Sequence, residues 1–288
     1  MTLLATAYSY LYQFGDSFAY LTLSSLGLAI IFGMMGVINL AHGEFVMCGA
    51  YVTILSAKAG LPLPLAMLAG AVSAAAAGAI LERLIVRHLY NRLFDSIVAT
   101  WAVSLITQQA MLIFAGPSIE GLSTPFHSFE FGEYSFSTYR ALLPFFSIAV
   151  LAALYGLFFK TNYGIYARAT IQNARMARCL GLRTSRIYTM TFALGAGLAG
   201  LAGAIYAPTI SAVPTMGSSF IVPAFVTVVT GGANVLQGIF PAAGFLGLIQ
   251  SALSASYGQL AGQIGLLLTV IVIIRMLPQG LGSLFNRK

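Results

Sequence analysis

Long apolar runs separated by short polar segments make up most of this chain. At about 20 residues for one membrane crossing, the pattern predicts eight long helices and one shorter apolar segment. We expect the helices at 18–38, 44–60, 63–86, 95–115, 141–160, 187–207, 236–256 and 262–277, and the shorter segment at 219–230. The fold class is therefore all-α: a polytopic integral membrane protein with about eight or nine transmembrane helices, broken ones included. Residues 1–288 are expected to form a single transmembrane domain.

Composition supports the same class. Hydrophobic residues make up 59% of the chain and charged residues 7%, whereas an ordinary soluble domain has about 25% charged residues. Such a chain cannot cover a water-facing surface. The net charge of +7 would suggest nucleic-acid binding in a soluble protein, but here the excess lies in loops and at the C-terminus. We therefore expect membrane lipid, and no nucleic acid, as its partner.

The basic residues are unevenly distributed among the loops. Segment 160–186 holds six of the fourteen Lys and Arg residues and no acid, and basic residues also occur in 83–94 and 278–288. Segment 117–139 carries three glutamates and no Lys or Arg. Because cytoplasmic loops are enriched in Lys and Arg, we expect the three basic segments inside the cell and 117–139 outside.

Small residues are abundant inside two of the predicted helices. Residues 69–78 are nearly all Ala and Gly, and residues 194–204 read LGAGLAGLAGA. Small side chains allow helix backbones to approach closely, which is how packing is gained in lipid. We expect tight helix packing at both segments, with a flexible hinge as the alternative.

An internal repeat links two distant parts of the chain. GVINLAHGEF begins at Gly36 and GGANVLQGIF begins at Gly231, so equivalent residues are 195 positions apart. Polar residues at equivalent positions are His42 and Gln237. Repeats of this kind predict two related halves, each with an interrupted hydrophobic segment. The identical pairs are Gly36 and Gly231, Asn39 and Asn234, Gly43 and Gly238, and Phe45 and Phe240.

A break of this kind frees backbone N–H and C=O groups that lipid cannot satisfy. It must therefore be buried in protein or line a wet cavity, where amide side chains complete the hydrogen bonds. The residues expected to line such a path are Asn39, His42, Glu44, Asn234 and Gln237. Alternatively, 39–44 is a cytoplasmic turn in which Glu44 is favoured by the dipole of the following helix.

No motif for chemistry is present in the sequence. The chain has no G-x-x-x-x-G-K-[ST] phosphate loop, no H-E-x-x-H and no G-x-S-x-G, and its acids are few and dispersed. We expect no catalytic residue, no metal and no cofactor, so the protein is not expected to be an enzyme. Any ATP would be bound by partner subunits.

The basic segment has the features of a short amphipathic helix. Ala174, Ala177 and Leu180 have helical spacing, and Gly181 is well placed to end the helix in a left-handed cap. Such a helix docks into a groove on a partner protein. The alternative is a helix that lies on anionic lipid.

Three segments together resemble a known family. GLAIIFGMMGVINLAHGEFVMCGAY at 27–51, NARMARCLG at 173–181 and MLPQGL at 276–281 resemble the permease subunits of ABC importers for branched-chain amino acids and for urea. The resemblance extends from about residue 20 to 285. It implies a bacterial inner-membrane permease with a homologous permease partner, two ATPase subunits and a periplasmic binding protein.

The resemblance also assigns a role to the basic segment. It implies that 161–186 is a cytoplasmic coupling loop that contacts an ATPase. The residues that take this role by resemblance are Asn173, Arg175, Met176, Ala177, Leu180 and Gly181.

The substrate and the transport mode have alternatives. TIQN at 170–173, PTMGSSFIVPAF at 214–225 and MLPQGL look closer to the urea branch, although 219–230 and 253–265 depart from it. We expect urea or a short amide, with branched-chain amino acids as the alternative. A passive channel for a small neutral solute is the competing function, since paired Asn-containing breaks also suit a narrow pore. A membrane enzyme is the third possibility.

Overall fold

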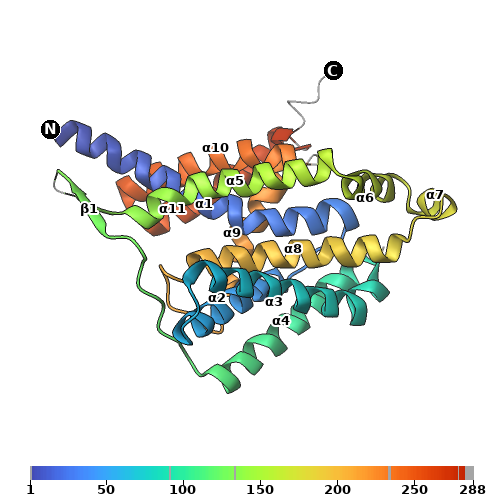
Figure 1. Ribbon diagram of the computed structural model, residues 1–288. Helices are drawn as coiled ribbons and strands as arrows, with labels where there is room; N and C mark the ends of the chain where they lie inside the picture. Colours follow the sequence, from blue (N-terminus) through green and yellow to red (C-terminus); the bar gives the residue numbers. More distant parts are fainter. Residues whose placement is uncertain (1, 91, 133, 233–234, 278, 283–288) are drawn as a thin grey trace. The chain divides into compact units, whose positions relative to one another are not determined.

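The computed structural model describes residues 2–90, 92–132, 134–232, 235–277 and 279–282, and this part of the chain is mostly helical (Figure 1). The long helices are α1 (Thr2–Met35), α2 (His42–Lys58), α3 (Leu63–Leu84), α4 (Leu93–Ala115), α5 (Thr138–Lys160), α8 (Thr184–Tyr206), α9 (Gly217–Gly231), α10 (Val235–Tyr257) and α11 (Gln259–Met276). The shorter elements are the 3-10 helix η1 (Val86–Leu89), strands β1 (Ser128–Phe131) and β2 (Tyr134–Ser137), and helices α6 (Asn162–Gln172) and α7 (Ala174–Cys179).

Every helix expected from the apolar runs is present, and the all-α fold class is confirmed. Seven described helices are long and apolar enough to cross a membrane: α1, α3, α4, α5, α8, α10 and α11. Helices α2 and α9, with 17 and 15 residues, are shorter pieces that each adjoin a break. A chain with these spans is a multi-pass membrane protein.

Two features differ from the expectation. Helix α1 begins at Thr2 rather than near residue 18, because the tyrosines of its first turns lower the hydropathy without preventing a helix. The segment expected only as an outer loop contains a two-stranded antiparallel hairpin, in which Ser128 pairs with Ser137 and Phe131 with Tyr134. Strands of four residues are too short for the alternation of apolar and polar side chains to predict them from the sequence.

The chain forms two compact units, and each draws on segments that are far apart in the sequence. One unit contains Met1–Ser25, Thr124–Ala152 and Pro223–Lys288, and the other contains Leu26–Ser123 and Ala153–Val222. We refer to them as the hairpin unit and the glycine-packed unit.

Apolar packing and an aromatic cluster hold the hairpin unit together. Tyr8 and Tyr12 of α1 contact Phe136 of β2, with ring centroids 5.0 and 4.9 Å apart. The Tyr12 hydroxyl also accepts a hydrogen bond from the Ser137 N–H at 3.2 Å. The core of this unit is formed by buried side chains of α1, α10 and α11, namely Phe18, Leu21, Ala243, Leu246, Leu266, Val270 and Ile273.

Small residues bring three helices of the glycine-packed unit into contact. Helices α2, α3 and α8 lie side by side (Figure 1). A Cβ atom added at Gly49 of α2 would overlap the backbone of Gly200 on α8, and one added at Gly203 would overlap the carbonyl of Val46. A Cβ at Gly200 would in turn overlap Ala74 of α3. The close packing expected for 69–78 and 194–204 is therefore present, with backbones close enough that only glycine fits.

This packing predicts a position-specific cost for one added methyl group. Gly49→Ala should lower the free energy of unfolding by roughly 1–3 kcal/mol, because backbone atoms of α8 cannot yield as a side chain can. Gly156→Ala is the matched control, since Gly156 also lies inside a helix and an added Cβ there would meet nothing within 4 Å. The control should be neutral or slightly stabilising, by at most about 1 kcal/mol. Thermal unfolding of the two purified variants measures the difference, and equal midpoints would contradict this account of the packing.

Candidate functional site

A break between α1 and α2 interrupts the helical hydrogen bonds in the apolar part of the chain. Helix α1 ends at Met35, Gly36 takes a left-handed conformation with φ of 62°, and α2 begins at His42. Two of the freed N–H groups find partners: that of Ala41 donates to the Asn39 side-chain oxygen at 3.1 Å, and that of Leu40 donates to Thr100 Oγ1 at 3.0 Å. The expected break is thus present and is satisfied within the protein.

Glu44 places a carboxyl group directly after this break. Its side chain is buried, and Oε1 accepts hydrogen bonds from Ser104 Oγ and Gln108 Nε2, both at 2.8 Å. Within the described part of the chain, Oε2 receives no hydrogen bond. A buried carboxyl oxygen without a donor is costly in an apolar environment, and an ionisable side chain at this position is a functional candidate.

Helix α4 supplies the partners of the break, and sequence reasoning missed them. Ser96, Thr100 and Ser104 are buried and Gln108 is half-buried. The four residues recur every fourth position, so they form one polar stripe along the helix. The signal was available in the sequence as a period of four within an otherwise apolar helix.

Asn39 and His42 are also buried at this break. Asn39 is 1% exposed and His42 is fully buried, and the Asn39 side-chain Nδ2 donates to no atom of the described residues. His42 Cε1 lies 3.0 Å from the position that a Cβ at Gly27 of α1 would occupy, so the glycine leaves room for the imidazole. Asn39, His42 and Glu44 are thus all buried around the break, and we refer to them with the α4 stripe as the buried polar cluster. Glu44 and the Leu40 N–H bond to α4, whereas His42 lies against α1.

The second expected break is present between α9 and α10. Helix α9 ends at Gly231, Gly232 is left-handed with φ of 80°, and α10 begins at Val235. The left-handed glycine is one residue later than the repeat predicts from Gly36.

The remaining residues of the predicted path are placed differently. Asn234 lies outside the described residues. Gln237 lies inside α10, in the hairpin unit, and its side chain is exposed. It therefore does not share the buried setting of His42, its counterpart in the repeat. Gly43 and Gly238 do correspond: each lies in the first turn after its break and touches the backbone of another glycine, Gly217 and Gly231 respectively.

The basic segment forms two short helices that are capped at their junction. The Asn173 side chain accepts a hydrogen bond from the Met176 N–H at 2.9 Å, which caps α7. At the other end, Gly181 has φ of 86°, its N–H donates to the Arg178 carbonyl, and the Leu182 N–H donates to the Ala177 carbonyl, both at 3.0 Å. This is the Schellman arrangement, so the left-handed cap expected at Gly181 is confirmed.

Two exposed apolar side chains lie on α7 and at its C-cap. Met176 and Leu180 are 57% and 76% exposed and are four residues apart, whereas Ala177 is 2% exposed. Ala177 thus faces inward and supports the helix, and Arg175 is exposed beside the apolar pair. Short helices do not stay folded by themselves in water, so the caps at Asn173 and Gly181 account for a six-residue helix here.

Helix α6 is attached to its neighbours by polar contacts. The Arg168 guanidinium donates a hydrogen bond to the Phe158 carbonyl and lies 5.1 Å from the ring centroid of Phe159. The Tyr163 hydroxyl is hydrogen bonded to Thr191 Oγ1 of α8 at 2.8 Å, and burial raises the pKa of this phenol above its usual value. These contacts orient the segment that carries α7. Nowhere in the described ranges do three or more His, Cys, Asp or Glu residues lie close enough to hold a metal ion.

The chain matches one protein family along nearly its whole length. The model of the branched-chain amino acid transport system permease component matches residues 11–277. The high-affinity branched-chain amino acid transport system permease protein LivH of Escherichia coli K12 is 26% identical over 277 residues, covering 90% of each chain. BraD of Pseudomonas aeruginosa, a permease protein of the same description, is 27% identical over 279 residues with the same coverage. A probable branched-chain amino acid transport permease protein LivH of Methanocaldococcus jannaschii is 26% identical over 282 residues, covering 91% of this chain and 88% of its own.

No solved structure matches the chain. The relatives are transport permeases, which places this chain in a transporter family. Together with the seven apolar spans, the match makes this a multi-pass protein of the bacterial inner membrane. The protein belongs to the family of permease components of branched-chain amino acid transport systems.

Proposed function

We propose that this chain is the membrane-spanning subunit of an ABC importer and that separate ATPase subunits drive it through α7. The observation that carries the proposal is the exposed Met176 and Leu180 pair on a helix capped at both ends. An exposed apolar pair on a helix held in place by polar contacts suits docking into a groove of a partner. A permease without a phosphate loop needs such a contact to receive energy from ATP.

The sidedness of the loop follows from its charge. Segment 160–186 carries six basic residues and no acid, so it belongs on the cytoplasmic side, where the ATPase subunits are. Segment 117–139, which contains the β hairpin, carries glutamates without Lys or Arg and belongs on the opposite side. There it is available to a periplasmic binding protein. A homologous permease partner and two ATPases complete the proposed assembly.

The buried polar cluster is the proposed part of the translocation path in this chain. Asn39 and Glu44 each keep one polar atom without a partner in the described residues. Such atoms can bond to a passing polar solute without breaking a hydrogen bond of the fold. Asn234 and Gln237 keep the same proposed role on the grounds of the repeat alone.

We propose branched-chain amino acids as the substrate, because the relatives that match most of the chain carry that name. A carboxylate such as Glu44 also complements the ammonium group of an amino acid. Urea or a short amide, the expectation from 170–173 and 214–225, is the alternative that the transport assay must separate.

The first prediction concerns energy and substrate together. Proteoliposomes that contain the chain, its permease partner, the ATPases and the binding protein should take up labelled leucine only when ATP is present. A tenfold excess of unlabelled isoleucine or valine should suppress uptake strongly, whereas urea or acetamide should not. Suppression by urea instead would favour the short-amide alternative. Uptake that continues unchanged without ATP, or flux through the chain alone, would support a passive channel.

The second prediction tests the docking face. Leu180→Glu should reduce co-purification of the ATPase subunits at least tenfold, because a charge replaces an exposed apolar anchor. Ile165→Glu is the matched control: Ile165 is also exposed, at 54%, but lies on α6 rather than α7. It should co-purify the ATPases as the parent does. If both variants co-purify the same amount of ATPase in a pull-down, α7 is not part of the interface. Equal amounts of both variants in the membrane show that insertion is unaffected.

The third prediction tests the buried carboxyl group. Glu44→Gln preserves the shape and the acceptor for Ser104 and Gln108 but removes the charge, so uptake should fall at least tenfold while the unfolding midpoint changes little. Ser104→Ala, the control, removes one of the two hydrogen bonds and should cost about 1 kcal/mol of stability with a smaller effect on uptake. If Glu44→Gln transports at the parental rate, Glu44 serves only the N-terminal turn of α2.

A further inference from the structure

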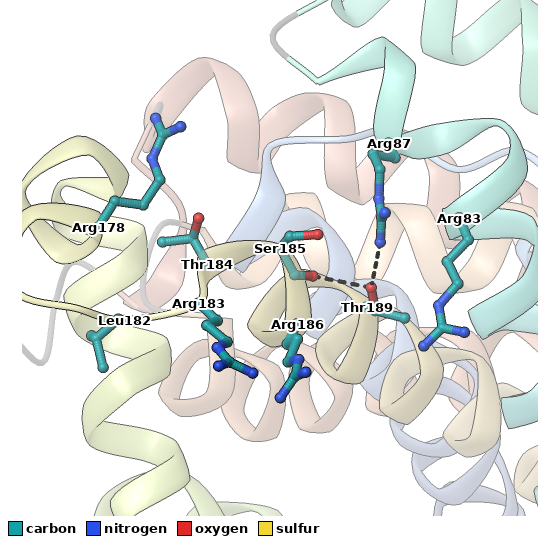
Figure 2. Close-up of a pocket in the computed structure, with 9 residues that line it drawn as sticks. All are labelled: Arg83, Arg87, Arg178, Leu182, Arg183, Thr184, Ser185, Arg186 and Thr189. Atoms are coloured by element: carbon teal, nitrogen blue, oxygen red, sulfur yellow. Dashed lines mark hydrogen bonds between the residues drawn. The ribbon is translucent and has the colours of Figure 1, made fainter.

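A strongly basic groove lies where the last turn of α3 approaches the first turn of α8 and the end of the α7 segment (Figure 2). Its volume is about 530 Å³. None of the lining residues is acidic. Five of them are arginines, namely Arg83, Arg87, Arg178, Arg183 and Arg186, and the others are Leu182, Thr184, Ser185 and Thr189.

One wall of the groove is fixed by a buried carboxylate. Glu82 is fully buried and accepts hydrogen bonds from Thr189 Oγ1 at 2.6 Å, from the Tyr90 hydroxyl and from Arg87, whose guanidinium is 3.4 Å away. Burial and the hydrogen bond to Glu82 both raise the pKa of Tyr90, so this phenol stays protonated and donates. In Figure 2, Arg87 reaches down to Thr189, to which it also donates at 3.1 Å.

The other four arginines carry charges that nothing in the described residues neutralises. Salt bridges in the described parts of the chain are formed by Arg87, Arg92 and Arg140. Arg83, Arg178, Arg183 and Arg186 therefore face one groove without a carboxylate partner. Like charges that line one groove repel one another, and an anion bound in the groove is attracted by them.

Helix α8 adds to this preference. It begins at Thr184, its first turn contains no acid, and no side chain caps its N-terminus. The helix dipole at this end favours a negative charge. Arg183 and Arg186 extend in the same direction from this turn (Figure 2).

The groove also lies at the boundary of the apolar spans. Leu84 is the last residue of one candidate span and Thr184 is the first residue of another, so the arginines sit at the depth of lipid headgroups. Exposed apolar side chains follow on the same helices. Ile80, one turn before Leu84, is 59% exposed, and Met190, one turn after Arg186, is 58% exposed.

We propose that this groove binds the phosphate of an anionic phospholipid headgroup, with the acyl chains lying along Ile80 and Met190. The planar guanidinium fork matches a phosphate through paired hydrogen bonds. Basic pockets between transmembrane helices on the cytoplasmic side suit such headgroups. A soluble phosphate shares this chemistry, but the apolar surface that continues from the groove favours the lipid.

The test uses the purified full-length chain in neutral detergent, without ATPase partners, and native mass spectrometry of bound phosphatidylglycerol. Arg183→Gln/Arg186→Gln should weaken lipid binding roughly thirtyfold, because each basic residue near the membrane surface strengthens the binding of an anionic lipid by about fivefold. Lys160→Gln/Arg175→Gln is the matched control, because it removes two charges from the same basic segment outside the groove lining. The control should bind as the parent does, and phosphatidylcholine should bind to none of the variants specifically.

Further arms separate the outcomes. Arg183→Lys/Arg186→Lys keeps the charge without the planar fork and should give an intermediate affinity, which also covers the case in which the Gln pair does not fold. Equal loss in the control pair, or full displacement of the lipid by millimolar inorganic phosphate, would overturn the proposal. Unchanged lipid binding with lost ATPase co-purification in the Gln pair would assign the groove to the protein interface instead.

Discussion

Lipid cannot hydrogen bond to a peptide group, and this constraint organises the glycine-packed unit. Where α1 ends at Met35, the following backbone leaves the helical pattern, so its N–H groups need partners from elsewhere in the protein. Asn39 supplies one from within the break and Thr100 supplies another from α4. The polar stripe on α4 is thus the counterpart of the break, and the buried Glu44 depends on the same helix for both of its donors.

Close helix packing is what allows this break to be buried. Glycines on α2 and α8 bring backbones into contact, and Gly27 leaves space for the His42 ring. The same helix α8 begins at Thr184 in the basic groove and passes Gly195, Gly200 and Gly203 on the way to its C-terminus. One continuous helix therefore extends from the segment with α7 to α2 and α3.

The positions of the helices followed from the sequence because hydropathy is a local property of about 20 residues. The cap at Gly181 and the interruption after Met35 were also predictable, since glycine supplies a left-handed turn that other residues adopt only with strain. The repeat paired Gly43 with Gly238, and the structure shows that both are positions of close backbone contact. The left-handed glycine of the second break, Gly232, is one residue later than the counterpart of Gly36, which a pattern match does not reveal.

The sequence by itself determined the membrane class, the helix order, the basic segment and the residues around Asn39, each readable within a short window. Only the tertiary structure decided which polar groups meet. Gln108 binds Glu44 across 64 residues, Thr189 binds Glu82 across 107, and Ala177 turns inward while Met176 and Leu180 stay exposed. Such contacts depend on how helices are rotated and how closely they pack. The rotation of each helix is set by small residues on its neighbours. A short stretch of sequence does not identify which helices become neighbours in the fold.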